Sequence, residues 1–234
     1  MQLSKRLETI FHMIRPCRCL ADIGTDHAYL PIACVQENKA ETAVASDVRQ
    51  GPLERAEAHV REAGLSGKIS LRLGDGLSTL RPGEADEIVI AGMGGKLMKR
   101  LLLDGEAQVK AAELLVLSPH TDIPEVREAL HPLGFSITDE AMVSEEGKFY
   151  TVILAERKEA SPLTEEELLY GLVLLKKRPE AFLQWLSFKE KTLEERLEAF
   201  SLQEKEGKLS GRGLQAKRAA ENELEAVRKL QGDI

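Results

Sequence analysis

Residues 20–31 read LADIGTDHAYLP, an apolar run that ends in an acid, then one glycine, then a polar turn that leads into a helix. A strand of an α/β sheet that ends in this way turns the chain sharply and points backbone N–H groups at a ligand beside the helix start. Gly24 supplies the turn, because a residue without Cβ adopts positive φ and lets a ligand approach the backbone. The stretch therefore predicts the opening of a nucleotide-type cofactor site.

The same stretch limits the kind of cofactor. A nicotinamide site has the pattern G-x-G-x-x-G, but positions 26 and 29 here are Asp26 and Tyr29. The missing second and third glycines argue against a cofactor that carries a pyrophosphate. Asp22, at the end of the strand, suits a positively charged cofactor, and we expect S-adenosylmethionine.

The composition restricts the class of protein. At 234 residues the chain is long for one domain and short for two, which favours one α/β domain with an appendage. A net charge of −7 argues against a protein that passively coats nucleic acid. An aromatic content of 4% argues against the stacking platforms of single-strand binders.

The cysteines and the lack of long apolar runs indicate the compartment. Cys17, Cys19 and Cys34 lack zinc spacing and cannot all pair within the chain, so we expect free thiols, no metal and a reducing environment. No part of the chain approaches the ~20 apolar residues of a membrane span. We therefore expect a cytoplasmic protein without a membrane partner.

Helix and strand patterns alternate from the N-terminus to about residue 157. An amphipathic helix comes first, and short apolar strands of the buried type follow, each separated from the next by a helical segment. This alternation predicts an α/β fold with a Rossmann-like, doubly wound, mostly parallel sheet, closed by an antiparallel pair around residues 145–147. The expected strands are 19–23, 42–48, 68–74, 87–91 and 114–118, with the closing pair in 135–157.

After Ser161 and Pro162 the sequence contains no strand pattern, and its charge is dense and mixed. Its leucines keep helical spacing on both sides of a break at 207–213, and Pro179 separates a first helix from a second. We expect two or three helices that form an antiparallel, coiled-coil-like hairpin. The predicted domains are 1–160, an α/β domain, and 161–234, a C-terminal helical coiled-coil domain.

Several polar and glycine residues follow directly after the predicted strands. In a parallel sheet, ligands bind outside the carboxyl ends of the strands, so these residues converge on one edge. Asp47, 23 positions after Gly24, suits the ribose hydroxyls of an adenosine group, and a helix-capping role is the alternative. The residues that meet at this edge are Asp22, Asp47, Asp75 and Gly92.

Two further turns complete the expected cofactor site. Asp75 is placed to accept a hydrogen bond from the adenine amino group, and Gly76 lets the backbone pass close by, although an ordinary Asp-Gly turn is the alternative. In AGMGG (91–95), small residues leave room for a flat ring beside the methyl donor, and a tight strand-to-helix turn explains the same glycines. From this turn we count Gly92, Met93 and Gly94 as cofactor-binding residues.

Three side chains crowd the first loop and are the candidate catalytic residues. If a nucleobase nitrogen accepts the methyl group, the site must align nitrogen, methyl and sulfur, and take up or share a proton. Asp26 or His27 is placed to take that proton, and Tyr29 to stack on the base. The alternative is that all three only shape the loop. Lys96, Lys99 and Arg100, on the helix after AGMGG, are candidate phosphate contacts or a solvated face.

Taken together, DIGTDHAYLP, SDVRQGPLERA, LGDGL, AGMGG and the late E-x-G-K-x-Y that ends at Tyr150 resemble the bacterial tRNA (adenine-22-N1)-methyltransferases over the whole chain. The resemblance implies a class I methyltransferase that moves a methyl group from S-adenosylmethionine to N1 of adenine 22 in tRNA. It also implies that Asp22, Gly24, Asp47, Asp75 and the Gly92–Gly94 loop hold the cofactor, with Asp26, His27 and Tyr29 at the target base. One departure is Ser118-Pro119-His120, where relatives usually have Gln-Pro-Asn.

The resemblance gives the helical domain a role, because its basic residues are placed to grip the tRNA backbone. A second copy of the chain is the other partner that these helices suit, and we favour a monomer. Two other functions stay open, a small-molecule methyltransferase and a non-catalytic RNA-binding protein on the same fold. The expected RNA contacts of this region are Lys176, Lys177, Arg178 and Arg212, with Lys208, Lys217 and Arg218 beside them.

Overall fold

The computed structural model describes residues 3–159 and 161–232, which form two compact units, Met1–Lys177 and Arg178–Ile234. The predicted boundary between 160 and 161 involves residue 160, which lies outside the described residues. The short helices α7 (Glu165–Tyr170) and α8 (Leu172–Lys177) follow it and still belong to the first unit. The first unit therefore extends 17 residues beyond the predicted α/β domain.

A seven-stranded sheet organises the first unit, in the order β3-β2-β1-β4-β5-β7-β6. Strands β1 to β5 are parallel, while β7 runs antiparallel to both β5 and β6. The predicted Rossmann-like fold class is thereby confirmed, as is the closing antiparallel pair. The strands are β1 (Cys17–Ile23), β2 (Ala40–Asp47), β3 (Ile69–Leu73), β4 (Glu87–Ala91), β5 (Leu114–Ser118), β6 (Phe135–Glu145) and β7 (Lys148–Arg157).

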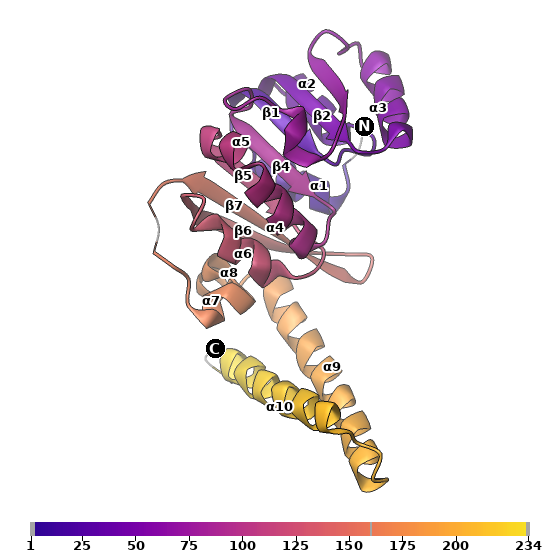
Figure 1. Ribbon diagram of the computed structural model, residues 1–234, viewed down its shortest axis with the longest axis vertical. Helices are drawn as coiled ribbons and strands as arrows, with labels where there is room; N and C mark the ends of the chain where they lie inside the picture. The colour runs from indigo at the N-terminus through magenta and orange to yellow at the C-terminus, as the bar shows by residue number, and fades with distance from the viewer. Residues whose placement is uncertain (1–2, 160, 233–234) are drawn as a thin grey trace. The chain divides into compact units, whose positions relative to one another are not determined.

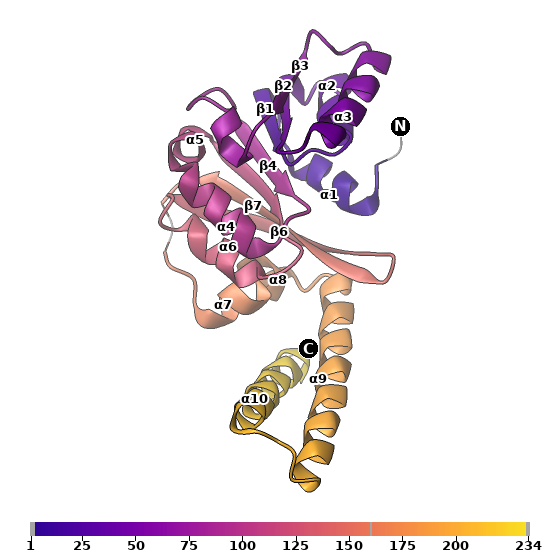
Figure 2. The ribbon, with the colours of Figure 1, turned by 45° about the vertical axis from the view of Figure 1, so that its right-hand side comes forward.

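Helices cover both faces of the sheet (Figures 1 and 2). Successive side chains of a strand point to opposite faces, so Ala21 and Ile23 of β1 join one core cluster and Leu20 joins the other. The two apolar faces explain why these strands read as continuous apolar runs. On one side lie α1 (Lys5–Met13), α2 (Tyr29–Gln36) and α3 (Gln50–Glu62), and on the other α4 (Gly95–Asp104), α5 (Glu106–Ala111) and α6 (Ile123–Leu130).

A buried ion pair fixes α7 and α8 to the sheet. The Arg127 guanidinium on α6 donates to Oε1 of Glu140 on β6 at 2.8 Å and to the carbonyl oxygen of Leu168 at 2.7 Å. The other carboxylate oxygen of Glu140 accepts the N–H of Val173 at 2.9 Å. Because each buried charge has partners, neither is left with the full desolvation cost of an isolated ion.

The second unit is a helical hairpin of α9 (Glu180–Lys205) and α10 (Gly211–Gly232). Pro179 is the N-cap of α9, as its position in the sequence predicts. Phe182, Leu186 and Leu193 of α9 are buried, as are Leu224 and Val227 of α10, and ion pairs such as Lys189–Glu223 at 2.6 Å flank this seam. The helical C-terminal region is thereby confirmed. None of the helices in the described ranges 3–159 and 161–232 is long and apolar enough to cross a membrane.

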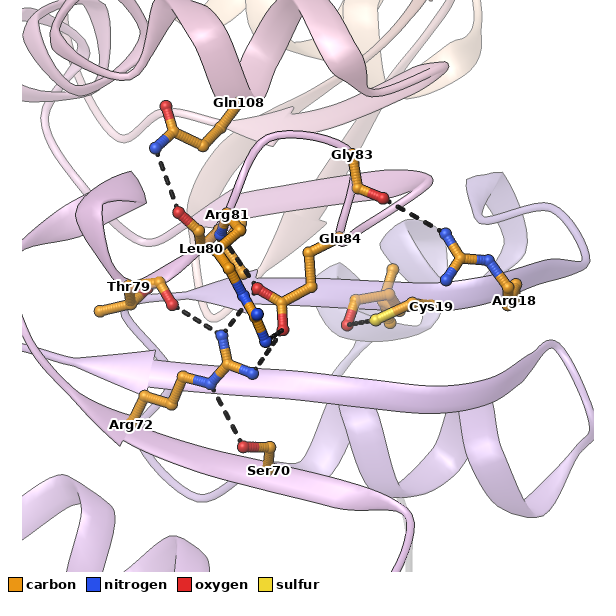
Figure 3. A network of polar contacts seen from close by, with 11 residues as sticks. Arg18, Cys19, Ser70, Arg72, Thr79, Leu80, Arg81, Gly83, Glu84 and Gln108 are labelled. Atoms are coloured by element: carbon orange, nitrogen blue, oxygen red, sulfur yellow. Dashed lines mark hydrogen bonds and ion pairs between the residues drawn. The ribbon is translucent and has the colours of Figure 1, made fainter.

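A fork of hydrogen bonds ties β3 to the loop before β4 (Figure 3). The Arg72 guanidinium donates to both carboxylate oxygens of Glu84, at 2.6 and 3.0 Å, and to the carbonyl oxygen of Thr79 at 2.7 Å. This bidentate pairing lowers the pKa of Glu84 to about 2. The backbone N–H of Arg81 donates to Oε2 of Glu84 at 2.9 Å, whereas the Arg81 guanidinium approaches the same carboxylate only at 3.9 Å and its side chain is 88% exposed.

We predict that Glu84→Gln lowers the free energy of unfolding at pH 7 by about 1.5–3 kcal/mol, because it removes charge-assisted hydrogen bonds. The folded-state pKa lies below the ordinary value of 4.5, so the stabilisation is present above that pH and is lost as pH falls toward 2. Denaturant unfolding between pH 3 and 7 should therefore show the two proteins converging in acid. Arg81→Gln, the matched exposed control, should change stability by less than about 0.5 kcal/mol.

Candidate functional site

The carboxyl ends of β1 and β4 meet where the order of the strands reverses. From β1 the chain adds β2 and β3 on one side, and from β4 it adds β5 on the other. Gly24 follows β1 with φ +82°, and a Cβ built there would overlap the terminal methyl of Met93, which follows β4. The two loops that the sequence assigned to the cofactor are therefore in contact at the topological switch point, where α/β sheets bind ligands.

A pocket of about 410 Å³ opens at this point. It is lined from α1, from the loop after β1 and from the end of β4, so segments distant in sequence share its wall. Its polar and glycine lining includes Arg6, Asp22, Gly24, Asp26, His27 and Tyr29.

Asp22 presents a buried carboxylate to this pocket. Its exposed fraction is 8%, and burial raises its pKa to about 6, although a hydrogen bond from Thr25 acts in the opposite direction. A carboxylate that has little contact with solvent and no ion pair among the described residues is destabilised in its charged form, and a cationic ligand would stabilise it.

Asp47 lies at the end of β2 and is also buried. Its Oδ1 accepts the backbone N–H of Arg49 at 2.7 Å, which orients the carboxylate at the start of the segment that leads into α3. The neighbouring Val48 is 62% exposed, although its side chain is apolar. Val48 ends the predicted strand 42–48 and lies in the motif SDVRQGPLERA, but sequence reasoning gave it no role, because neither pattern indicates that its side chain is exposed.

Asp75 and Gly76 follow β3 and begin a short 3-10 helix at Gly76–Thr79. Asp75 is exposed. Gly76 has φ +53°, and a Cβ there would lie 2.5 Å from a methyl group of Leu101 on α4. The glycine is thus needed for both its backbone conformation and the packing of α4.

The three glycines of AGMGG have different structural roles. Gly92 is exposed with φ +81°, whereas Gly94 has an ordinary φ of −67° as the N-cap of α4. A Cβ at Gly95 would overlap the backbone carbonyl oxygens of Thr121 and Asp122, and its N–H donates to the Thr121 carbonyl at 2.8 Å. Gly95, absent from the predicted site residues, is therefore the glycine on which the close approach of two loops depends.

Asp26 is paired rather than free. Arg55 of α3 donates to its Oδ1, and His27 Nε2 lies 3.3 Å from its Oδ2. The Arg55 hydrogen bond lowers the pKa of Asp26, so this carboxylate is a weaker proton acceptor than an ordinary aspartate. It is nevertheless 58% exposed at the mouth of the pocket.

Three aromatic rings pack together beside this carboxylate. His27 and Tyr29 stack with centroids 4.9 Å apart and planes 10° apart, and His59 of α3 lies 5.0 Å from Tyr29. His59 Nδ1 is also 3.2 Å from the carbonyl oxygen of His27. The structure thus brings the three predicted catalytic residues together. Sequence reasoning missed His59, because an isolated histidine on an amphipathic helix carries no signal.

A second cluster was also missed. Arg6 NH1 of α1 lies 2.8 Å from His120 Nε2 in the loop after β5, and its guanidinium carbon is 5.2 Å from the Tyr150 ring centroid on β7. His120 and Tyr150 meet edge to face at 5.6 Å. The backbone N–H of His120 donates to the Met93 carbonyl at 2.8 Å, which attaches this loop to the AGMGG turn. Of this cluster, Tyr150 lies in a motif quoted from the sequence and His120 in the Ser118-Pro119-His120 departure, but Arg6 lies in neither.

Comparisons with known proteins agree with this geometry. Residues 3–153 match the family described as a methyltransferase domain. A Bacillus subtilis protein, tRNA (adenine(22)-N(1))-methyltransferase, is 42% identical over 156 residues, which is 67% of this chain and 66% of that protein. The crystal structure of the B. subtilis M1A22 tRNA methyltransferase TrmK superposes with a TM-score of 0.87 at 31% identity, over 98% of this chain and 99% of that one.

The chain belongs to the tRNA (adenine(22)-N(1))-methyltransferase family. A further family structure, Streptococcus pneumoniae Sp1610 in complex with S-adenosyl-L-methionine, matches with a TM-score of 0.87 and 30% identity, over 98% of this chain and all of that one. The resemblance drawn from the sequence motifs is thereby confirmed. In the described part of this member of the family, no group of three or more His, Cys, Asp or Glu side chains gathers as a metal site.

The basic residues expected at RNA differ in their surroundings. Lys99 is bonded to Glu125 at 2.6 Å and to Glu128 at 2.7 Å, because α6 packs on α4. Lys96 lies 3.7 Å from Asp122. Arg100 is exposed and has no ion pair within the described residues.

The basic residues expected at RNA in the C-terminal region also divide into those that have partners and those that form no ion pair. Lys177 bonds to Asp139 at 2.8 Å, and Arg178 donates to the Leu230 carbonyl while its Nε is buried without a partner. Lys217 is bonded to Glu204 at 2.6 Å. By contrast, Lys176 and Arg212 form no ion pair in the part of the chain that the structure describes.

The AGMGG turn offers a matched test of its glycines. We predict that Gly95→Ala lowers the free energy of unfolding by about 1–3 kcal/mol, because the new methyl group overlaps rigid backbone. Gly94→Ala should cost less than about 1 kcal/mol, since its Cβ would lie 3.3 Å from the movable Thr121 hydroxyl. Thermal unfolding of both variants measures the difference, and equal transition temperatures would contradict the assigned packing.

Proposed function

We propose that this protein transfers a methyl group from S-adenosylmethionine to N1 of adenine 22 in tRNA. The observation that carries the proposal is the junction of Gly24 with Met93, where a pocket is lined by the desolvated carboxylate of Asp22 and the exposed carboxylate of Asp26. Asp22 would lie next to the positively charged methyl donor, and Asp26 next to the base that becomes positively charged when it is methylated. Membership of the family supplies the acceptor.

The residues present fit the cofactor. Gly24 has no Cβ at the switch point, where the Met93 methyl takes the space that a Cβ would need, so backbone faces the pocket. Ser46 Oγ, near the end of β2, and Ser118 Oγ, at the end of β5, are buried without a hydrogen-bond partner, which suits polar groups of a ligand. When bound, S-adenosylmethionine supplies a methyl group on a positively charged sulfur. Asp22 would attract that positive charge and the ammonium group, Asp47 would accept hydrogen bonds from the ribose hydroxyls, and the exposed apolar side chain of Val48 would cover the adenine ring. Asp75, Gly76, Gly92 and Gly94 would line the rest of the cofactor site.

Asp26 has a role that its lowered pKa supports. Transfer forms a bond between N1 and the methyl carbon and breaks the bond to sulfur, and the positive charge passes to the adenine ring. An ionised carboxylate near that ring stabilises the developing charge and accepts a hydrogen bond from the exocyclic amino group. Arg55 and His27 keep Asp26 ionised and oriented, and Tyr29 packs beside them at the base. We therefore assign Asp26 to charge stabilisation rather than to proton removal.

The tRNA backbone requires positive groups in a protein whose net charge is −7. Exposed arginines and lysines without carboxylate partners are the best candidates, because ion pairs would have to break before the others reached phosphate. This reasoning retains Arg100, Lys176 and Arg212 and gives Lys96, Lys99, Lys177 and Arg178 a smaller part. A monomer that acts in the cytoplasm fits this role.

The deciding experiment is methyl transfer from labelled S-adenosylmethionine to unmodified bacterial tRNA, with the product nucleoside identified by mass spectrometry. We expect 1-methyladenosine, and its loss when adenine 22 is replaced by guanine. Labelled cofactor that binds without transfer to tRNA would overturn the proposal and favour a small-molecule acceptor. Tight tRNA binding without cofactor affinity would favour a non-catalytic RNA-binding protein.

Two substitutions should separate cofactor binding from catalysis. Asp47→Ala should weaken the affinity for S-adenosylmethionine by about tenfold or more, because it removes charge-assisted hydrogen bonds to two hydroxyls. Asp26→Asn should instead lower the rate of the chemical step by about tenfold or more while cofactor affinity stays within about twofold. Calorimetry and single-turnover kinetics measure the two effects. An Asp47→Ala protein with unchanged affinity would contradict the assigned ribose contact.

The raised pKa of Asp22 predicts a pH-dependent cofactor affinity. The ionised carboxylate binds the cation, so affinity should be constant above the pKa of about 6 and fall by about tenfold per pH unit below it. Asp22→Asn should bind more weakly at pH 7.5 and lose this dependence. Calorimetric titrations from pH 5 to 8 test both, and an unchanged pH profile in Asp22→Asn would assign the titration to another group.

A further inference from the structure

Arg6 has an environment unlike that of any other charged residue lining the pocket. Its guanidinium forms no ion pair among the described residues, although it lines the same pocket as Asp22 and Asp26. The other arginine beside this pocket, Arg55, is bound to Asp26. Arg6 is therefore a positive charge in the wall of the pocket that no carboxylate neutralises.

The side chain of Arg6 is nevertheless held in place. His120 Nε2 lies 2.8 Å from NH1, and the Tyr150 ring lies beneath the guanidinium with its centroid 5.2 Å away. Burial and the positive charges of Arg6 and Lys148 lower the pKa of His120, which leaves its ring neutral and Nε2 free to accept the hydrogen bond from Arg6. A neutral acceptor and an aromatic face restrict the guanidinium without cancelling its charge.

Arg6 lies beside the AGMGG turn, which we propose as part of the cofactor site. Arg6 NH1 would lie 3.5 Å from a Cβ built at Gly92, and the same His120 that holds it is bonded through its backbone N–H to the Met93 carbonyl. The guanidinium thus stands directly beside the exposed turn next to which the acceptor base must enter. One nitrogen faces His120, and the remaining N–H donors of the planar fork are available to a ligand.

The two carboxylates of the pocket set the electrostatic requirement. A nucleotide that enters brings a phosphate toward Asp22 and Asp26, and that approach is unfavourable unless a cation offsets the repulsion. A guanidinium matches a phosphate in both charge and bidentate geometry. We propose that Arg6, positioned by His120 and Tyr150, binds a phosphodiester of the tRNA strand next to the target nucleotide. The inference rests on the proposed function, in which tRNA is the substrate.

The salt dependence of tRNA binding gives a readout specific to a phosphate contact. Each lost contact reduces the slope of log affinity against log salt concentration by about 0.7–0.9. Binding of tRNA to Arg6→Gln in the full chain with S-adenosylhomocysteine should therefore show a slope reduced by about that amount. In turnover with S-adenosylmethionine, the KM of this variant for tRNA should rise about tenfold. Cofactor affinity should stay within about twofold. Arg81→Gln makes the same charge change in the loop before β4, at the amino ends of the parallel strands. This variant should leave the salt slope and the KM for tRNA unchanged.

Conservative variants test the geometry. Arg6→Lys should keep the wild-type slope, since it keeps the charge, while KM rises a few-fold because the fork is lost. Tyr150→Phe should resemble the wild type, and Tyr150→Leu together with His120→Leu should resemble Arg6→Gln in KM. Circular dichroism confirms that each variant is folded.

The outcomes separate this inference from the proposed function. An Arg6→Gln protein with the slope and KM of Arg81→Gln overturns the inference while wild-type methylation of adenine 22 still supports the function. A raised KM with an unchanged slope also overturns it, because it would indicate a base or sugar contact. If the wild type binds tRNA with a slope that Arg6 controls but transfers no methyl group, the function fails and the contact stands. A wild type that does not bind tRNA overturns both.

Discussion

The close contact between Gly24 and Met93 is the constraint on which the rest of the site depends. The terminal methyl of Met93 occupies the space that any side chain at position 24 would need, so the loops after β1 and β4 meet at the centre of the sheet. Both loops turn through residues with positive φ, Gly24 and Gly92, which lets backbone rather than side chains face the ligand. Gly95 extends the junction by bringing the loop after β5 against α4. The loops after β1, β4 and β5 are thereby held together, and the ends of β1 and β4 line the pocket.

This junction places carboxylates in different environments, and the environments separate their roles. Asp22 is desolvated and has a raised pKa, Asp26 is exposed and has a pKa lowered by Arg55, and Asp47 is held by the N–H of Arg49. In the function that we propose, the desolvated carboxylate of Asp22 would attract the cationic methyl donor, whereas the carboxylate of Asp26 would stay ionised as charge develops at the acceptor. In that proposal, carboxylates of one pocket would serve two purposes, ground-state binding and charge stabilisation, because their environments differ.

Local signals in the chain predicted the strands and the residues after them, because each depends on a few adjacent positions. Apolar β-branched runs specify buried strands, and an acid or glycine directly after such a run must lie at the carboxyl edge. The Arg6–His120 contact joins residues 114 positions apart, and no local pattern encodes it. The attachment of α7 and α8 to the first unit has no local signal either, since Arg127 and Glu140 hold these helices through partners far along the chain.

Charge sign in the sequence is likewise a poor guide to charge that a ligand can use. Lys99 was a natural phosphate contact by its position after AGMGG, yet the packing of α6 on α4 brings two glutamates to it. In the helical hairpin, Arg228 bridges Glu190 and Glu194, so this positive charge links the helices to each other. Such exposed pairs contribute little to stability, but each also removes a cation from the set that RNA could contact. In a protein with a net charge of −7, the RNA contact that we propose would then rest on those described cations that have no carboxylate partner, and among them Arg6 is held beside the AGMGG turn.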